Sequence, residues 1–324
     1  MKLKILILGC GSIGTRHAKN LKSIGEKNII LCDKDQTRLQ SLANIIGTNL
    51  LYVDYRQAVK ENKDLLAAII CTPTSYHVEQ ALYFAKNGIN LFIEKPLSHN
   101  LDKVKSLQKI VDSNKLVVMM GHSYMFEFGF IKLKSLLEKK TIGQIYFVTY
   151  LQGQFLPDWH PKSDYRVEYT ARKNLGGGAL LTLTSHSFYL IEWLFGKVQS
   201  IRGNIVTRAG KLDVDVDDSV FLLMTTDENV IVQSQNNFIV PIHNHKIIVE
   251  GEKGRLEYDF VEKKIKILLR NKRSKILDVY KDPNDRFVKE MKYFLSNLKN
   301  NNLDKNLKLE SGIRFLQKMK NLVS

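Results

Sequence analysis

The segment Gly9-Cys10-Gly11-Ser12-Ile13-Gly14 has residue types and a spacing that suit it to holding a phosphate group. Gly9 permits a tight turn, Gly11 lets the backbone approach a pyrophosphate closely, and Gly14 lets a helix pack against a strand. Residues 15–24, which follow, are predicted to be helical. A pyrophosphate would therefore meet N–H groups at the positive end of a helix.

This Gly-rich segment lies between two apolar runs. Ile5–Leu8 is predicted to be a buried strand, Ile29–Cys32 a second strand, and Asp33 closes the second run. The order strand, glycine turn, helix, strand and acid is the dinucleotide-binding fingerprint, in which the acid accepts hydrogen bonds from the adenosine ribose. We expect NAD as the cofactor. NADP stays open, because Lys34 and Arg38 could offset the repulsion between Asp33 and a 2′-phosphate.

Residues 1–122 alternate between strand and helix patterns. Repeated βα units with continuously apolar strands predict a doubly wound parallel sheet of the Rossmann type, covered on both faces. The predicted strands are Leu3–Leu8, Ile29–Cys32, Leu66–Cys71, Ile89–Ile93 and Leu116–Met120, and the predicted helices between them include Asp35–Ile46, Ser75–Asn87 and Leu101–Ser113.

Residues 123–324 show a different pattern, which predicts an α+β domain. Short strand-like runs separated by short turns indicate a mostly antiparallel open sheet. Its predicted strands are Ile145–Leu151, Ser200–Val206, Ser219–Thr225, Val230–Asn236 and Lys246–Glu250, with Leu256–Phe260 and Lys264–Leu269 as two more. The predicted helices are Phe130–Lys139, Ala179–Leu194, Arg286–Leu298 and Leu307–Leu322.

Length and hydropathy bound the class of protein. A chain of 324 residues with 44% apolar residues indicates two globular domains. No apolar stretch reaches the ~18 residues of a membrane-spanning helix, and the first apolar run is too short for a signal peptide. We therefore expect a cytoplasmic protein with no membrane partner.

Charge and cysteine content narrow the partners further. The net charge of +16 comes from lysines spread along the whole chain. No basic segment carries the interleaved aromatic residues that stack on bases, so we expect no nucleic-acid partner. Cys10, Cys32 and Cys71 do not have zinc-ligand spacing, and we expect reduced thiols near the cofactor and no metal site.

Four further segments could carry chemistry. They are Cys71-Thr72-Pro73 with His77, Glu94-Lys95-Pro96, the triple glycine 176–178 with His186, and the stretch 159–166. The first two follow predicted strands, and ligands of doubly wound sheets lie at the carboxyl ends of the strands.

Together with the Gly-rich segment Gly9–Gly14 and Arg16-His17 after it, the first three of these segments resemble the glucose–fructose oxidoreductase/inositol dehydrogenase (Gfo/Idh/MocA) family. The resemblance covers the whole chain in order and spacing. It implies a Rossmann domain over 1–122 and an α+β domain over 123–324, whose open sheet lines the site and mediates assembly into a homodimer or homotetramer. Family members oxidise a sugar-like secondary alcohol, or reduce the ketone, with NAD or NADP.

The resemblance also implies roles for individual residues. Lys95 would lie beside the reacting carbon, where its ammonium can stabilise developing alkoxide charge, and a cis bond would join it to Pro96. His186 would donate or accept the proton. The cofactor-binding residues indicated by the fingerprint and the resemblance are Gly9, Gly11, Ser12, Ile13, Gly14, Asp33, Cys71, Thr72, Pro73, His77, Glu94 and Lys95.

Two positions depart from the family pattern. Thr182 stands four residues before His186, where relatives commonly carry Asp. A hydroxyl can bind substrate on the same helical face but cannot anchor an imidazolium charge. Either Thr182 suffices, another acid supplies the charge, or activity is lost and the chain is a nucleotide-sensing regulatory protein of the same fold. Met125 stands where many relatives have Arg, and no role is transferred to it.

The stretch 159–166 offers substrate contacts. Trp159 and Tyr165 could stack on a sugar ring, Arg166 could pair with a carboxylate or phosphate, and His160 is also available. A structural loop with a satisfied Arg166 is an equal alternative. We therefore expect an NAD(P)-dependent oxidoreductase of a sugar or sugar derivative, with an anionic substrate favoured by the basic charge. The substrate-binding residues would be Lys95, Trp159, Arg166, Thr182 and His186. A related reductase of a non-sugar carbonyl is a third alternative.

Overall fold

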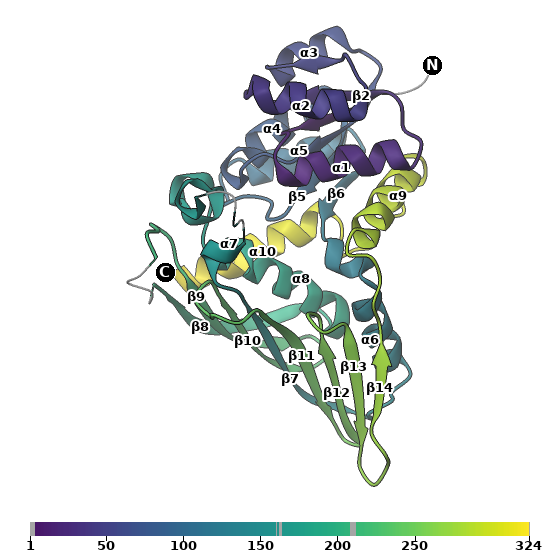
Figure 1. Ribbon diagram of the computed structural model, residues 1–324, viewed down its shortest axis with the longest axis vertical. Helices are drawn as coiled ribbons and strands as arrows, with labels where there is room; N and C mark the ends of the chain where they lie inside the picture. The colour runs from purple at the N-terminus through teal and green to yellow at the C-terminus, as the bar shows by residue number, and fades with distance from the viewer. Residues whose placement is uncertain (1–3, 160, 162–163, 208–211, 324) are drawn as a thin grey trace. The chain divides into compact units, whose positions relative to one another are not determined.

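The computed structural model describes residues 4–159, 161, 164–207 and 212–323 (Figure 1). The chain divides into two compact units. The first unit contains residues 1–122 and 287–316, and the second contains residues 123–286 and 317–324. Each unit has its own sheet.

The first unit is built on a six-stranded parallel sheet with the strand order β3-β2-β1-β4-β5-β6. This order is that of a doubly wound dinucleotide-binding fold, as predicted. The strands are β1 (Lys4–Leu8), β2 (Ile29–Cys32), β3 (Leu51–Tyr52), β4 (Leu65–Ile70), β5 (Asn90–Glu94) and β6 (Val118–Gly121). Their side chains are buried almost throughout, which explains the continuous apolar runs in the sequence.

Helices join the strands of this sheet. Because strand order reverses after β3 and crossovers are right-handed, the helices before and after that reversal cover opposite faces. They are α1 (Ser12–Ser23), α2 (Gln36–Ile46), α3 (Tyr55–Glu61), α4 (His77–Lys86) and α5 (Val104–Ser113). Figure 1 shows these strands and helices in purple to blue.

Three loops share the carboxyl edge of this sheet. β1 lies between β2 and β4, and β4 lies between β1 and β5. In register, Leu8 pairs with Ile70 and Ile70 pairs with Ile93. The Gly-rich segment, the loop 71–73 and the loop 94–96 therefore leave neighbouring strands side by side.

The second unit is built on an eight-stranded sheet with the order β14-β13-β12-β11-β7-β10-β9-β8. β10 runs parallel to β7, and all other pairs are antiparallel. The strands are β7 (Ile145–Gly153), β8 (Val198–Val206), β9 (Ser219–Thr226), β10 (Ile231–Asn237), β11 (Asn244–Gly251), β12 (Gly254–Asp259), β13 (Lys264–Leu269) and β14 (Lys275–Asp278). The prediction of a mostly antiparallel sheet is confirmed.

Helices cover one face of the second sheet. α8 contacts β8 and β9, whereas α6 contacts β12 and β13. Side chains alternate along β7, where Val148 and Tyr150 are buried and Phe147 is exposed, so the face opposite the helices is open. The helices of this unit are α6 (Phe128–Glu138), α7 (Ala179–Thr182) and α8 (Thr184–Phe195).

The C-terminal helices are α9 (Asp285–Asn300) and α10 (Leu309–Val323). The sequence assigned both to the second domain, but residues 287–316 pack in the first unit. Phe294 of α9, for example, lies edge-on against Phe92 of β5, with ring centroids 5.5 Å apart. In the described part of the chain, no helix is long and apolar enough to cross a membrane.

Candidate active site

The Gly-rich segment forms a tight turn between β1 and α1. Gly9 has a φ of +96° and its N–H donates to the carbonyl oxygen of Cys32 at 2.8 Å. A Cβ on Gly9 would lie 2.9 Å from the carbonyl group of Cys71, and one on Gly14 would overlap the carbonyl oxygen of Gly9. A Cβ on Gly11 would meet no described atom within 4 Å. The turn is therefore packed tightly beneath Gly9 and Gly14 and open beside Gly11.

The start of α1 faces this turn without a capping group. Gly11 is the N-cap residue, no side chain caps the helix, and its first turn contains no acidic residue. Ser12 is exposed and Ile13 is half-buried. The first N–H groups of a helix have no partner within it and, with the helix dipole, favour an anion. This arrangement fits the pyrophosphate of NAD.

Asp33 is oriented by backbone groups at the end of β2. Its Oδ2 accepts a hydrogen bond from the N–H of Cys10 at 2.6 Å, and its Oδ1 accepts one from the N–H of Asp35 at 2.8 Å. The carboxylate is thus held against the Gly-rich segment. Nearby Arg38 pairs with Asp35 at 3.3 Å, and Lys34 is exposed.

Glu94 connects the Gly-rich helix to the loop that carries Lys95. His17 of α1 is fully buried, and its Nε2 lies 2.7 Å from Oε1 of Glu94. Oε2 of Glu94 accepts a hydrogen bond from the N–H of Lys95 at 3.3 Å. The peptide bond between Lys95 and Pro96 is cis, as the resemblance implied.

Lys95 is partly buried at this edge. Burial lowers the pKa of Lys95 to about 8, although the carboxylate of Glu94 acts in the opposite direction. An ammonium that is easily deprotonated near neutral pH can exchange a proton or a hydrogen bond with a ligand oxygen.

The three cysteines lie near this edge as buried free thiols. Burial, together with the charge of Asp33, raises the pKa of Cys10 to about 12. Burial also raises the pKa of Cys32 to about 12 and that of Cys71 well above its usual value. Thiols in this state are poor nucleophiles.

The loop 71–73 is braced by side chains of the following helix. The hydroxyl of Thr72 hydrogen-bonds Oε1 of Gln80 at 2.6 Å. His77 is 1% exposed, and both of its ring nitrogens face backbone carbonyl oxygens. Cys71 is buried and Pro73 precedes a short helical turn, Thr74–Tyr76.

In the second unit, the triple glycine ends at the start of α7. Gly178 has a φ of +102°, and a Cβ there would overlap the carboxylate of Asp217. Oδ2 of Asp217 accepts a hydrogen bond from the N–H of Leu180 at 2.7 Å. Burial raises the pKa of Asp217 to about 6. Sequence reasoning missed Asp217, because no local signal distinguishes it from the other three aspartates in the stretch 213–218.

The predicted single helix over Ala179–Leu194 is interrupted. α7 ends at Thr182 and α8 begins at Thr184, and the N–H of His186 bonds the carbonyl oxygen of Leu183 rather than that of Thr182. Thr182 is 2% exposed, and its hydroxyl donates to the carbonyl oxygen of Gly178 at 2.6 Å. The hydroxyl proton of Thr182 is therefore used in a hydrogen bond to the backbone.

His186 is half-buried and lies against an aromatic group of the second unit. Its ring centroid is 4.6 Å from that of Tyr124, with an interplanar angle of 37°. Tyr124 also lies 5.2 Å from the ring of His245, and Nε2 of His245 is 2.7 Å from the hydroxyl of Tyr150. Sequence reasoning missed Tyr124 and His245, which stand 121 positions apart and meet only in the folded unit.

Two residues of the loop that begins at Trp159 contact other residues of the protein. Trp159 packs edge-on against Phe238 at 5.3 Å. Nε and Nη2 of Arg166 both contact the carboxylate of Asp164, at distances of 2.7–3.0 Å. One edge of the guanidinium is thus already paired. His160 lies outside the described residues.

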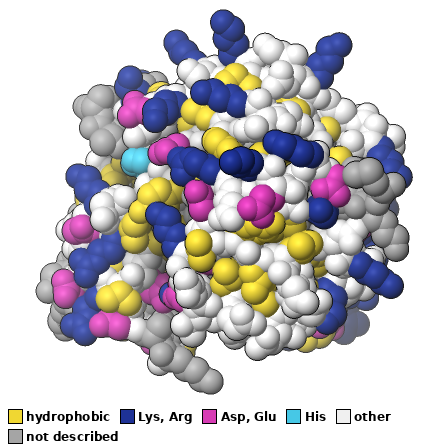
Figure 2. Space-filling view, turned by 90° about the horizontal axis from the view of Figure 1, so that it is seen from above, with side chains coloured by type: hydrophobic (Ala, Val, Ile, Leu, Met, Phe, Trp, Pro, Cys, Tyr) yellow, Lys and Arg dark blue, Asp and Glu magenta, His cyan; other side chains and the backbone are white. Residues whose placement is uncertain are grey.

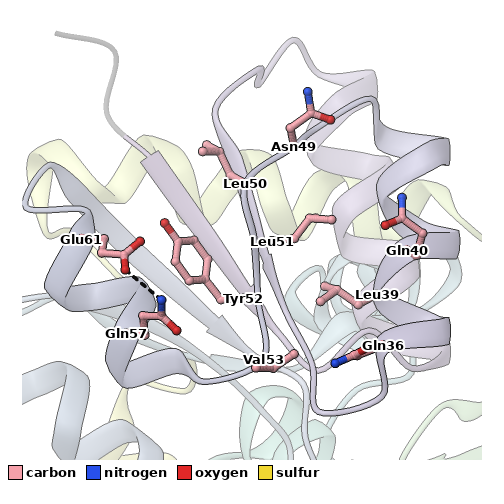
Figure 3. Close-up of a pocket in the computed structure, with 10 residues that line it drawn as sticks. All are labelled: Gln36, Leu39, Gln40, Asn49, Leu50, Leu51, Tyr52, Val53, Gln57 and Glu61. Atoms are coloured by element: carbon pink, nitrogen blue, oxygen red, sulfur yellow. Dashed lines mark hydrogen bonds between the residues drawn. The ribbon is translucent and has the colours of Figure 1, made fainter.

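A separate pocket of about 410 Å³ lies along the edge strand β3 (Figure 3). α2 and α3 flank it, and Gln57 hydrogen-bonds Glu61 at 2.8 Å on its rim. It is lined by Gln36, Leu39, Gln40, Asn49, Leu50, Leu51, Tyr52, Val53, Gln57 and Glu61. This lining includes none of the residues predicted to bind cofactor or substrate.

Basic side chains do not gather into one patch on the face shown in Figure 2. Lysine and arginine side chains are scattered there, with acidic and apolar side chains between them. A nucleic-acid interface would require a continuous basic surface. The expectation of no nucleic-acid partner remains a prediction.

Two stretches of the chain match one family of proteins. Residues 3–122 match GFO_IDH_MocA, an oxidoreductase family with an NAD-binding Rossmann fold. Residues 130–257 match the GFO/IDH/MocA C-terminal domain. The two matches follow one another along the chain and fall on the two sheets.

Similar proteins of known sequence include two inositol dehydrogenases. The myo-inositol 2-dehydrogenase of Thermotoga maritima is 27% identical over 310 residues, which are 92% of this chain and 88% of that protein. The inositol 2-dehydrogenase of Rhizobium meliloti is 25% identical over 259 residues, which are 78% of this chain and 74% of that protein.

Solved structures show the same fold. Levoglucosan dehydrogenase in complex with NADH has a TM-score of 0.87 at 16% identity, covering 100% of this chain and 96% of that chain. An oxidoreductase from Agrobacterium radiobacter in complex with NAD⁺, L-tartaric acid and magnesium has a TM-score of 0.86 at 14% identity, with the same coverage.

Proposed function

Because the chain belongs to the Gfo/Idh/MocA oxidoreductase family, we propose that it is an NAD-dependent dehydrogenase of a secondary hydroxyl on a sugar or cyclic polyol, or a reductase of the corresponding ketone. One observation carries the proposal. Lys95, whose burial lowers its pKa to about 8, follows β5 on the sheet edge that also holds the Gly-rich segment. Inositol dehydrogenases among the relatives support a polyol substrate.

In this proposal, residues 1–122 bind NAD and residues 123–324 bind the substrate. Bound NAD would supply the hydride acceptor. The ammonium of Lys95 donates a hydrogen bond to the substrate oxygen and stabilises charge that develops there. His186 accepts the hydroxyl proton during oxidation and returns it during reduction. The ring of Tyr124, 4.6 Å away, holds the His186 imidazole in place.

Two observations bear on whether the substrate is neutral or anionic. Arg166 was predicted to bind an anion, but Asp164 occupies its Nε and Nη2. This contact supports the alternative of a structural loop with a satisfied Arg166, and it weakens the argument for a sugar acid or nucleotide sugar at that residue. The net charge of +16 remains the argument for an anion.

A substrate screen tests the proposal directly. Inositols, neutral sugars, sugar acids and nucleotide sugars are incubated with the protein and NAD, and absorbance is followed at the nicotinamide band. We expect turnover of at least one cyclic polyol or sugar. The regulatory alternative, which Thr182 leaves open and which Lys95 and His186 argue against, replaces our proposal if no compound is turned over while NAD alters binding to a protein partner.

We expect the wild-type protein to bind NADH more tightly than NADPH. Asp33 would repel a 2′-phosphate, and Arg38 is already paired with Asp35. Asp33→Asn should lower NADH affinity about tenfold, since a hydrogen bond to a charged group contributes about 1.5–3 kcal/mol. Fluorescence titration of both cofactors measures the ratio, and tight NADPH binding with negligible NADH binding by the wild type would contradict the expectation.

Thr182→Val is expected to lower turnover by about two- to tenfold, the effect of one lost neutral hydrogen bond. A hydroxyl that donates to Gly178 can still accept a bond from a ligand. Thr182→Ser keeps the hydroxyl and should retain turnover, which makes it the matched control. Thr182→Asp restores the family pattern. Equal turnover rates for Thr182→Val and the wild type would show that the hydroxyl bonds the backbone only and does not contact the substrate.

We also propose that the protein is a homodimer or homotetramer that associates through the open face of the second sheet. This face carries exposed apolar side chains from neighbouring strands, namely Phe147, Phe221, Leu223 and Ile231. Ile231 pairs in register with Phe147, so these two lie together on that face. Exposed apolar clusters of this kind mark association sites.

Light scattering after size exclusion tests the assembly. Leu223→Arg combined with Ile231→Arg should reduce the mass to that of a smaller species. Val53→Arg, at an equally exposed apolar residue of the first unit, is the matched control and should leave the mass unchanged. A wild-type monomer at micromolar concentration would refute the proposal.

A further inference from the structure

His77 lies between two of the loops that carry predicted contacts in the first unit, the loop 71–73 and the loop 94–96. It is the first residue of α4 and is 1% exposed. Its Nδ1 is 2.9 Å from the carbonyl oxygen of Pro96, and its Nε2 is 2.7 Å from the carbonyl oxygen of Thr72. A single ring thus joins the loop after β4 to the loop after β5.

We propose that His77 is a positioning residue for the reaction, which fixes the backbone of Lys95 by holding the carbonyl group of Pro96. This inference rests on the proposed role of Lys95. The sequence placed His77 among the cofactor-binding residues. Its ring nitrogens are occupied by the protein backbone, so it acts through Lys95 and not by contacting NAD.

The backbone of Lys95 is held from both sides. On the N-terminal side, its N–H donates to Glu94, which contacts buried His17 at 2.7 Å. On the C-terminal side, the carbonyl group of Pro96 accepts from His77. These two contacts fix the backbone from which the side chain of Lys95 projects. A site that must meet a substrate oxygen within a fraction of an ångström requires such support.

The protonation state of His77 decides whether its ring donates a hydrogen bond to Pro96, to Thr72 or to both. Carbonyl oxygens only accept, and a neutral imidazole has one N–H, so both bonds together require the imidazolium. Burial lowers the pKa of His77. The two carbonyl oxygens and the carboxylate of Glu94 raise it, and the charge of Lys95 lowers it. A neutral ring donates one bond, and the proposal assigns that proton to Nδ1, which faces Pro96.

Two conservative variants separate the two bonds. The amide nitrogen of Asn replaces Nδ1 of histidine, and that of Gln replaces Nε2. His77→Asn therefore retains a donor for Pro96, whereas His77→Gln retains one for Thr72. His77→Leu removes both. Each variant is assayed for turnover with the substrate found in the screen, and for NADH affinity by fluorescence titration.

We expect His77→Leu and His77→Gln to lower turnover by about 10²-fold, the effect of displacing a reacting group by ~1 Å. His77→Asn should recover most of the turnover. NADH affinity should change far less than turnover in His77→Leu and His77→Gln, and should stay close to the wild-type value in His77→Asn. Equal turnover in those two variants, or full turnover in His77→Leu, would overturn the proposal.

A double-mutant cycle with Lys95→Ala tests whether His77 acts through Lys95. In the Lys95→Ala background, His77→Leu should cause little further loss of turnover. A further loss of about 10²-fold would show that His77 acts independently and would overturn the inference. If Lys95→Ala alone keeps full turnover, the role of Lys95 and this inference both fail, while the dehydrogenase activity stands. The proposed function fails only if the wild type turns over no compound in the screen, so the two failures are distinguishable.

Circular dichroism and thermal unfolding accompany every variant. If His77→Leu does not fold, the comparison of His77→Asn with His77→Gln still decides, because both keep a buried polar side chain of similar size.

Discussion

Replacement of Lys95 by alanine is expected to lower turnover by about 10²–10³-fold, the usual effect of removing one donor to a developing oxyanion. NADH affinity should stay nearly unchanged, because the interaction acts on charge that forms only in the transition state. Steady-state kinetics and fluorescence titration measure the two quantities. Near-wild-type turnover in Lys95→Ala would rule out the assignment.

Lys95→Arg is the matched control, and it adds a pH test. Burial lowers the pKa of Lys95 to about 8, so the ammonium is present below pH 8 and is lost as the pH rises through that value. Turnover in the reducing direction should fall over this range, because the neutral amine is a weaker donor to the ketone oxygen. Arginine stays charged at all relevant pH values. Lys95→Arg should therefore keep part of the activity and lose this decline.

The first unit could be predicted closely because its signals are local. The glycines, the acid and the buried strands each follow from short segments whose spacing is fixed by backbone geometry. β3 and α3 were missed. β3 has only two residues, Leu51 and Tyr52, so it shows no periodic pattern. α3 has seven residues with two of them buried.

The interruption between α7 and α8 has a local cause that periodicity does not reveal. Residues 182–187 contain four hydroxyl-bearing side chains around Leu183 and His186. Such side chains bond nearby carbonyl groups and compete with the helical ladder. Thr182 bonds the carbonyl oxygen of Gly178, and Ser187 bonds that of Thr184. The apolar pattern over Ala179–Leu194 predicted one helix, because such a pattern reports burial. It does not report the competition of side-chain hydroxyls for backbone carbonyl groups.

Long-range packing could not be predicted from the sequence. The sequence predicted a helix over Arg286–Leu298, but not which of the two sheets it packs against. Phe287 and Phe294 lie near His17 and Phe92 of the first unit. Likewise, nothing in the sequence brings Tyr124 to His186. Site residues that lie within one short segment can thus be predicted from the sequence. Site residues that are distant in sequence and meet only in the folded unit cannot.

Gly14→Ala is expected to abolish measurable NADH binding and to destabilise the first unit. A methyl group at this position would overlap the carbonyl oxygen of Gly9, so the backbone of the turn must move. Backbone shifts of this kind cost about 1–3 kcal/mol. Alanine is otherwise the better helix former, so a loss of stability can only come from this contact. Thermal unfolding and cofactor titration measure both effects.

Gly11→Ala provides the contrast that separates binding from folding. A Cβ on Gly11 meets no described atom within 4 Å, and its φ of −68° suits alanine. Stability should be unchanged, or higher by about 0.4–1 kcal/mol, because alanine restricts the unfolded chain. NADH affinity should fall by about 10²-fold or more, since the methyl group would keep a pyrophosphate from at least two N–H donors worth about 1.5–3 kcal/mol each. Unaltered NADH affinity in a folded Gly11→Ala protein would contradict the proposal that the pyrophosphate binds at this turn.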